Sequence, residues 1–238
     1  MFSLEEYVAP SRTGADGMLK LVSAIDMMQD CSQMWMKSEP VFEKYFKEND
    51  MAQLLASRQM DILRRPAYGE KLRITTSVFD IQGFQGFRNT VIYDEDDKPC
   101  IVSWTTGAFV CMTTNRLTKV PDEISAQMTL DPKVDMEYLE RRIKVSDGEE
   151  ISFDPVPVMA NDIDMNKHMN NAHYVRIAME LLPRHFRVDR LRIEYKIPAA
   201  QGAMLYPYMI MQGDDCVFMQ LLNEGRLPHV IMEFSSLL

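Results

Sequence analysis

Two parts of this chain repeat one pattern: a polar loop, one amphipathic helix and then several strand-like runs. In the first part, apolar residues recur every three or four positions between Gly17 and Lys37, which predicts a helix with one apolar face. In the second part, the same pattern predicts a shorter helix from about Asn171 to Leu182. Because one such helix cannot bury its apolar face alone, the chain is expected to form two units of one architecture.

Alternating runs rich in Val, Ile, Thr and Phe follow each predicted helix. The first set extends from about Gln53 to Met112, with Leu72–Phe79 as its clearest strand. The second set is expected at 188–197, 204–212, 216–222 and 229–234, with polar hairpin turns between the last three and a further strand at 151–159, before the second loop. We therefore predict an α+β fold in which a long antiparallel sheet wraps around one central helix in each unit.

The segment between the two patterns differs from both in composition. Residues 126–150 are mostly polar or charged and include Pro132 and the pair Asp147-Gly148. Such a stretch is typical of a linker between folded units. The predicted organisation is a first domain at 1–125, a linker at 126–150 and a second domain at 151–238.

Charge and cysteine usage exclude several classes of protein. The net charge of −9 argues against a nucleic-acid-binding surface, because backbone phosphates need clustered Lys and Arg. No apolar run reaches the ~18–20 residues that a bilayer crossing needs, so no membrane span is predicted. Residues Met1–Glu6 lack the features of a secretory signal, and the four scattered cysteines fit no zinc or disulfide pattern. A reducing cytoplasm is the expected location.

The polar loop before the second helix is the most informative segment. Asp164, Asn166 and His168 occupy alternate positions, so in an extended loop their side chains would project to the same side. Asn170 or Asn171 then caps the helix, leaving free backbone N–H groups and the positive end of the helix dipole beside the three side chains. Such a group can hold a carbonyl oxygen as it gains negative charge.

Three other interpretations of this loop compete with a catalytic one. A purely structural role stays open, because Asp and Asn are common in loops and at helix caps. A calcium loop would begin like Asp162, Asp164 and Asn166, but Lys167 stands where such a loop needs Gly and His173 where it needs Glu. A transition-metal site would use His168, His173 and Asp164, but the sequence has no helical HExxH pair and this spacing is not a familiar ligand set. No metal and no redox cofactor is therefore predicted.

The loop also resembles a family signature. The run Asp164–Asn171, followed by Tyr174 and Glu180, resembles the signature of the acyl-acyl-carrier-protein (acyl-ACP) thioesterases of plants and bacteria. Further segments similar to that family are Ser57–Ile62, Arg65–Pro66, Gly69–Glu70, Val102–Trp104, Arg116, Pro121 and Ile193–Lys196. The resemblance spans nearly the whole chain and implies two tandem hot-dog domains, with the acyl chain in the first and the catalytic residues in the second.

By this resemblance, the expected reaction is hydrolysis of fatty acyl-ACP to a free fatty acid and holo-ACP. The catalytic residues carried over are Asp164, Asn166 and His168. We expect Asp164 and His168 to position and deprotonate water, while Asn166 and the amides near Asn170 and Asn171 orient the thioester and steady the oxyanion. The alternative makes a carboxylate the base and leaves His168 as an orienting donor.

One departure from the family pattern matters. Plant relatives carry an acidic residue implicated in catalysis a few positions after the Glu-Tyr pair, and here Pro198 and Ala199 stand there. Gln201 is the nearest polar residue, and it cannot act as a base. Strand alternation is expected to turn Glu194 toward solvent. A non-catalytic acyl-binding or carrier-binding module is therefore an alternative to the hydrolase. A hydratase-type hot-dog enzyme is a further alternative, although the Asp-x-Asn-x-His string resembles the thioesterases more closely.

The partner and the acyl chain suggest further candidate residues. ACP is strongly acidic, so a chain with net charge −9 needs a local positive surface to attract it. From Arg176 to Lys196 there are six basic residues against three acidic ones. We expect Arg184 and Arg187 to dock ACP, with a merely solvated face as the alternative. Met28 and Trp35 are candidates to line the acyl chain, which core packing explains equally well. A coenzyme A ester as substrate and a homodimer stay open.

Overall fold

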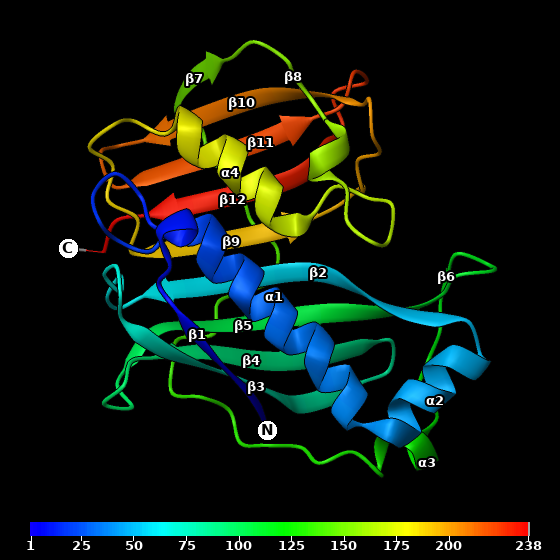
Figure 1. Ribbon diagram of the computed structural model, residues 1–238. Coiled ribbons are helices and arrows are strands. Elements are labelled where there is room, and N and C mark those ends of the chain that lie inside the picture. The colour runs from blue at the N-terminus through cyan, green and yellow to red at the C-terminus, as the bar shows by residue number, and fades with distance from the viewer. Residues whose placement is uncertain (238) are drawn as a thin grey trace. The chain divides into compact units, whose positions relative to one another are not determined.

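The computed structural model describes residues 1–237, which divide into two compact units. Unit 1 is Met1–Tyr138, and unit 2 begins at Leu139. Each unit contains an antiparallel sheet with one long helix across one of its faces (Figure 1). The α+β arrangement predicted from the repeated pattern is therefore confirmed. Among residues 1–237, no helix has both the length and the apolar character needed to cross a membrane.

Unit 1 carries most of the long strands. Its elements are β1 (Phe2–Tyr7), the short turn η1 (Pro10–Arg12), α1 (Leu21–Ser38), α2 (Pro40–Glu48), β2 (Met51–Ile62), β3 (Lys71–Gln82), β4 (Gln85–Tyr93), β5 (Pro99–Cys111), β6 (Arg116–Leu117) and α3 (Asp122–Ser125). The strand order is β1-β3-β4-β5-β2, and β6 pairs with β5.

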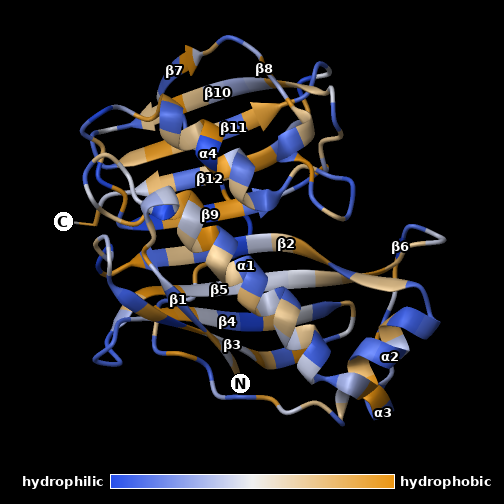
Figure 2. Cartoon of the chain, in the orientation of Figure 1, coloured by the Kyte–Doolittle hydropathy of each residue, from blue (hydrophilic) through white to orange (hydrophobic). Residues whose placement is uncertain are grey.

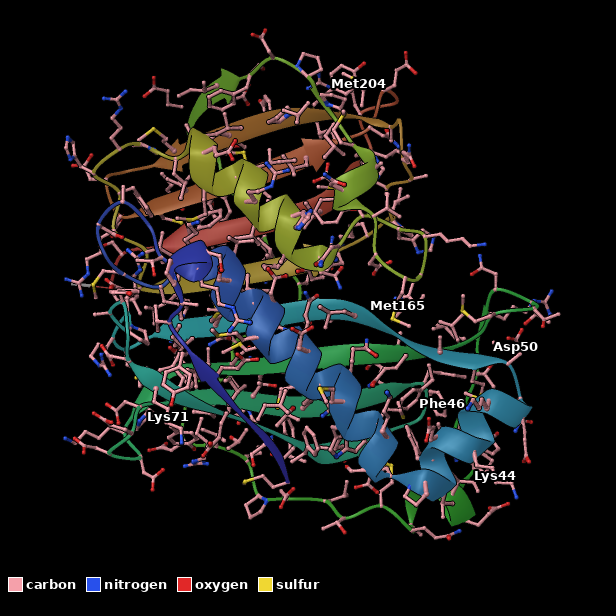
Figure 3. All side chains as sticks on the ribbon, viewed as in Figure 1. Lys44, Phe46, Asp50, Lys71, Met165 and Met204 are labelled. Atoms are coloured by element: carbon pink, nitrogen blue, oxygen red, sulfur yellow. The ribbon has the colours of Figure 1, made fainter. Side chains whose placement is uncertain are left out.

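Helix α1 packs an apolar face against this sheet, and orange and blue residues alternate along it in Figure 2. It begins at Leu21, later than predicted, because the residues from Gly14 to Lys20 form a turn. Pro40 stands in the first turn of the next helix, α2, where its missing N–H is harmless. The end of α1 and one face of α2 contribute Trp35, Phe42 and Phe46 to one apolar cluster. Figure 3 labels Phe46 on α2.

The other face of the unit 1 sheet is covered by residues 131–138, which fall within the predicted linker. The Tyr138 ring lies 5.8 Å from that of Phe79 and 5.6 Å from that of Trp104, measured between centroids. The Asn89 side-chain oxygen accepts hydrogen bonds from the Tyr138 hydroxyl and the Val134 N–H. This part of the segment is therefore folded against unit 1.

Unit 2 repeats the plan with shorter strands. Its elements are β7 (Glu149–Ser152), β8 (Val156–Pro157), the short turn η2 (Ala160–Asp162), α4 (Asn171–Leu181), β9 (Arg190–Tyr195), β10 (Met204–Gln212), β11 (Cys216–Leu222) and β12 (Pro228–Ser235). The strand order is β9-β12-β11-β10-β7, and β8 pairs with β10. Helix α4 contacts the sheet through Tyr174, whose ring centroid is 6.2 Å from that of Tyr195.

The predicted solvent exposure of Glu194 is wrong. Its side chain is buried, accepts a hydrogen bond from the Ile143 N–H at 3.3 Å and forms an ion pair with Lys196. Glu194 and Arg192 lie on one face of β9, and Arg192 donates to the Glu140 carbonyl. The segment from Glu140 to Ile143 covers this face, which the alternation of one strand cannot reveal.

Candidate functional site

The loop between η2 and α4 is a tight turn and not the extended ribbon that the alternation predicted. The Asp164 N–H donates to the His168 carbonyl at 2.8 Å, and the Lys167 N–H donates to the Asp164 carbonyl at 3.0 Å. Lys167 has a φ of 64°, a left-handed conformation that the turn requires. A bridge between Ile163 and Met169 closes the base of the turn.

This turn brings Asp164 and Asn166 together. The Asp164 carboxylate accepts hydrogen bonds from the Asn166 N–H at 2.8 Å, the Asn166 side-chain amide at 3.2 Å and the His168 N–H at 3.3 Å. His168 joins the group through its backbone only. Its half-buried ring has no hydrogen bond or ion pair with any of residues 1–237, so both ring nitrogens are available to a substrate or to water.

The start of α4 lies directly after the turn. The Asn170 side chain accepts a hydrogen bond from the Ala172 N–H at 2.9 Å, which confirms Asn170 as the predicted cap. The His173 N–H donates to the Asn170 carbonyl at 2.9 Å. These bonds occupy two of the amides that we expected to be free. Within the described chain, the Asn171 N–H makes no hydrogen bond.

A buried cluster supports the turn from below, and the sequence interpretation missed it. One oxygen of Asp162 accepts hydrogen bonds from the His173 ring at 2.9 Å and from the Arg176 guanidinium at 3.0 Å, and the other accepts from the Met159 N–H at 2.8 Å. Burial acts to raise the pKa of Asp162, but these three donors together lower it below its usual value. The three-residue spacing of His173 and Arg176 on one helix face was the available signal.

The position expected to be acidic is occupied by backbone contacts. Ala199 is fully buried; its carbonyl accepts from the Met169 N–H at 2.8 Å and its N–H donates to the Tyr174 hydroxyl at 2.9 Å. Pro198 and Gln201 are exposed. Ala199 therefore braces the loop through its backbone and supplies no side chain for chemistry.

Unit 1 contains a second copy of the turn. The Gly14 N–H donates to the Met18 carbonyl at 2.8 Å, and the Gly17 N–H donates to the Gly14 carbonyl at 3.0 Å. Gly17, with a φ of 76°, corresponds to Lys167. By these matching bonds, Gly14, Asp16 and Met18 correspond to Asp164, Asn166 and His168. The backbone is the same, but the copy in unit 1 lacks the imidazole and the first carboxylate.

An arginine closes the unit 1 copy. The Leu19 N–H donates to the Pro66 carbonyl, as the Met169 N–H does to Ala199, so Arg65 corresponds to Pro198. The Arg65 guanidinium donates to the Leu19 carbonyl and pairs with Asp16 at 2.7 Å. Unit 2 has no arginine at this place, and its turn therefore keeps its polar side chains free of such a cation.

The two candidates for lining the acyl chain lie in α1 of unit 1. Met28 is completely buried, and its sulfur lies 3.3 Å from a guanidinium nitrogen of Arg58. Trp35 is 3% exposed, and the guanidinium carbon of Arg88 lies 4.0 Å from its ring centroid. Each side chain therefore has a guanidinium beside it, and Trp35 also belongs to the apolar cluster.

The two candidates for docking ACP lie between α4 and β9. Arg184 is exposed and forms no ion pair within residues 1–237. The Arg187 side chain is 69% exposed but donates to Asp189 at 2.7 Å, which offsets part of its charge.

Comparisons with known proteins agree with this architecture. A chloroplastic acyl-(acyl-carrier-protein) hydrolase, FATB3, of Cuphea viscosissima is 24% identical over 93% of this chain and 58% of its own length. The chain thus spans little more than half of that relative. Two solved thioesterases match in fold. An acyl-ACP thioesterase from Bacteroides thetaiotaomicron has a TM-score of 0.88 and 17% identity, over 98% of this chain and 96% of its own. A 12:0-ACP thioesterase from Umbellularia californica has a TM-score of 0.81 and 15% identity, over 98% of this chain and 96% of its own.

The two units match two successive domain models. The acyl-ACP thioesterase N-terminal domain matches residues 4–128, and the acyl-ACP thioesterase C-terminal domain matches residues 145–222. The predicted double hot-dog fold is therefore confirmed. With both domains matched in order and most of the chain covered, this protein belongs to the acyl-ACP thioesterase family.

Proposed function

We propose that the protein hydrolyses fatty acyl-ACP to a free fatty acid and holo-ACP, with Asp164, Asn166 and His168 as its catalytic residues. The observation that carries the proposal is the turn in which the Asp164 carboxylate holds both the Asn166 amide and the His168 backbone N–H, while the His168 ring makes no hydrogen bond within residues 1–237. The turn of unit 1 has the same backbone bonds without these three side chains, so the architecture alone does not demand them.

His168 is the candidate general base. A water oxygen attacks the thioester carbonyl carbon while its proton passes to a ring nitrogen of His168; the C–S bond then breaks, and the sulfur takes up that proton as a thiol. Three donors already occupy the Asp164 carboxylate, which favours a positioning role for it. The alternative, in which Asp164 is the base and His168 orients the substrate, predicts a smaller effect of removing the imidazole.

The oxyanion needs donors that are not already engaged. The Asn171 N–H meets this condition at the positive end of α4, where the helix dipole also favours developing negative charge. The Asn166 side-chain amide is half engaged with Asp164 and keeps its second N–H for the thioester oxygen. Asn170 acts through the helix, because its own side chain is used as the cap.

The proposal also assigns residues to ACP docking and to binding of the acyl chain. Exposed Arg184, together with Arg187, would attract the acidic surface of ACP. The acyl chain is assigned to unit 1, where Met28 and Trp35 lie. Their burial is equally compatible with core packing, so this assignment rests on the family resemblance.

The test uses the purified chain with ACP carrying saturated acyl groups from octanoyl to stearoyl and with the matching coenzyme A esters, followed by identification of the released acids. We expect release from acyl-ACP that is lost in His168→Ala and Asp164→Ala. Met18→Ala is the matched control, because Met18 holds the corresponding place in the unit 1 turn.

The other outcomes are distinct. Faster turnover of the coenzyme A esters would favour the acyl-CoA alternative over acyl-ACP. Tight binding of acyl-ACP without any released acid would contradict the hydrolase and support a binding module. Hydration of an unsaturated chain without release of the thiol would support the hydratase alternative.

A further inference from the structure

The sheet of unit 1 has a polar centre on the face that meets α1. Antiparallel pairing sets residues of β3, β4, β5 and β2 side by side in rungs. The three central rungs are Ile74/Ile92/Ile101/Ile62, Thr76/Thr90/Ser103/Met60 and Val78/Arg88/Thr105/Arg58. They face the helix, because the Ser32 hydroxyl of α1 lies 3.4 Å from that of Thr76 and the sulfur of Met28 lies 3.3 Å from Arg58. We call Arg58, Thr76, Arg88, Thr90, Ser103 and Thr105 the polar centre.

Unit 2 provides an internal comparison. The rungs of β10, β11, β12 and β9 at the matching places are Pro207/Leu221/Val230/Tyr195, Met209/Met219/Met232/Ile193 and Met211/Val217/Phe234/Leu191. Apart from the Tyr195 hydroxyl, every side chain is apolar. The fold is therefore satisfied by an apolar face under its helix, and the polar centre is a feature of unit 1 that the architecture does not require.

Arg88 is the exceptional member of the polar centre. Arg88 is 6% exposed, and its guanidinium lies over the Trp35 ring. One of its guanidinium nitrogens donates to the Thr76 hydroxyl at 3.0 Å. Within residues 1–237 it has no carboxylate at ion-pair distance and no other hydrogen bond. A guanidinium has five N–H donors, so most of its hydrogen-bonding capacity is unused.

Such an arrangement is unfavourable unless something else engages the cation. Burying a charge without a partner is expensive, and buried polar groups in folded proteins are almost always satisfied. Burial lowers the pKa of Arg88 to about 10, with Cys31 and Glu39 opposing and Arg58 adding to that effect. The group nevertheless stays charged at neutral pH. A ligand with an oxygen acceptor would relieve this cost.

The surroundings restrict the kind of ligand. The four isoleucines of the first rung lie on one side of the polar centre. On the other side lies the apolar cluster that includes Trp35, Phe42 and Phe109. A free inorganic anion would meet only the middle of this surface. An aliphatic chain with one oxygen substituent would offer apolar groups to both sides and an acceptor to the polar centre.

We propose that unit 1 is selective for acyl chains that carry an oxygen acceptor (a hydroxyl, oxo or carboxylate group) and that Arg88, with Thr76 and Thr90, is the recognition group. This deepens the proposed function and rests on it for the acyl chain. The hydroxyls of Thr76 and Thr90 are 3.0 Å apart, so they form a short hydrogen-bonded relay from Arg88 across two strands.

The first test compares hydrolysis of four ACP thioesters of equal length: dodecanoyl, β-hydroxydodecanoyl, ω-hydroxydodecanoyl and ω-carboxyundecanoyl. We expect at least one oxygenated chain to exceed dodecanoyl in kcat/KM by about tenfold or more, because a site built to hydrogen-bond an oxygen discriminates strongly against its absence. The chain with the highest kcat/KM then identifies which oxygen group is recognised and at which position along the acyl chain. Equal or lower values for all three oxygenated chains would overturn the proposal.

The second test asks whether Arg88 causes the preference. In Arg88→Met the ratio of kcat/KM between the preferred chain and dodecanoyl should fall to near one, and Thr90→Val should lower it partly. Arg73→Met is the matched control: Arg73 also lies on the unit 1 sheet and over a ring, that of Tyr93, but pairs with Asp97 at the surface. A ratio unchanged in Arg88→Met would assign the arginine a structural role only.

A binding measurement separates this inference from the proposed hydrolysis. Trp35 contacts Arg88, so in a Trp104→Phe background its fluorescence reports on the polar centre. Hydroxydodecanoic acid or dodecanedioic acid should change this fluorescence at lower concentration than dodecanoic acid does. Selective binding without thioester hydrolysis would support selectivity for oxygenated chains and refute the proposed hydrolysis. Hydrolysis without selective binding would support the hydrolysis and refute the selectivity.

Discussion

The ring of His173 and the carboxylate of Asp162 lie 2.9 Å apart, joining the first turn of α4 to the end of η2. Arg176, one turn further along the helix, contacts the same carboxylate oxygen. Asp162 thus connects the chain before the candidate catalytic turn to the helix after it. We infer that Asp162 is a positioning residue that acts on the site through the backbone.

Removing the Asp162 carboxylate should therefore weaken both fold and site. In Asp162→Ala we expect the free energy of unfolding to fall by about 2–4 kcal/mol, because one buried charge-assisted cluster is lost. Denaturant unfolding measures this. Glu180→Ala is the control, since Glu180 only contacts Arg176 at the surface, at 3.4 Å, and its loss should change stability by less than about 0.5 kcal/mol. Equal effects of the two changes would contradict the role of Asp162.

The same cluster predicts a pH dependence. The pKa of Asp162 is lowered in the folded chain, so its contribution to stability is present above the unfolded value near 3.8 and is lost as pH falls through the lower folded value. The stability difference between the wild type and Asp162→Asn should be constant near neutral pH and shrink on acidification below about pH 4. Unfolding curves of both proteins across this range measure it; a difference that grows with acid would reverse the assigned sign.

Loss of the His168 ring should affect turnover and leave stability nearly unchanged. A general base typically contributes about 10²–10⁴-fold to rate, and we expect kcat of His168→Ala to fall within that range. Because the ring makes no hydrogen bond within the described chain, the free energy of unfolding should change by no more than about 0.5 kcal/mol. A large loss of stability would make the histidine structural and explain any loss of activity.

The left-handed residue in the turn should tolerate glycine. Lys167 has a φ of 64°, and its counterpart in unit 1 is Gly17. Lys167→Gly should leave stability unchanged or slightly higher, whereas Lys167→Val should lower it by about 1–2 kcal/mol, because a β-branched side chain crowds the backbone there. Thermal unfolding of the two variants measures the contrast.

Charge reversal tests the docking arginines. In Arg184→Glu combined with Arg187→Glu, we expect KM for acyl-ACP to rise several-fold at low salt and the difference to narrow at high salt, because exposed charges are screened. Hydrolysis of a small neutral thioester should be unaffected. If KM for acyl-ACP does not change, these side chains form only a solvated face.

The cysteines should differ in reactivity toward an alkylating reagent. Hydrogen bonds with Thr114 and Thr113 outweigh a small burial effect and lower the pKa of Cys111, whereas burial raises the pKa of Cys31 and of Cys216 to about 11. Because the thiolate is the reactive form, Cys111 should be modified first at neutral pH. Mass spectrometry of peptides after timed alkylation measures the order, and modification of buried Cys31 before Cys111 would contradict it.

The sequence predicted regular elements better than local geometry. The ranges of β10 and β11 were predicted without error, because residue alternation within a strand and the hairpin turns at its ends are both local sequence signals. Helix α2 was missed because Pro40 suits both an end and a beginning. The domain limits, the cytoplasmic location and the homodimer stay predictions.

The candidate site was predicted in composition but not in conformation. Alternate spacing suggested a ribbon, whereas Lys167 adopts a left-handed conformation and folds the loop into a turn. Burial of Glu194 depends on the segment from Glu140 to Ile143, which is distant in sequence and which periodicity does not register. Periodicity also does not reveal that Arg88 has no carboxylate at ion-pair distance among residues 1–237. The roles of Asp164, Asn166 and His168 stay proposals that the variants above test.

The duplicated turn separates scaffold from chemistry within one molecule. Since both copies share their backbone bonds, the triple replacement Gly14→Asp, Asp16→Asn and Met18→His, with Arg65→Pro to remove the closing guanidinium, would graft the reactive set onto the first copy. The turn of unit 1 is thus a scaffold without the candidate catalytic side chains. Adding these side chains to it one at a time would show which of them thioester cleavage requires.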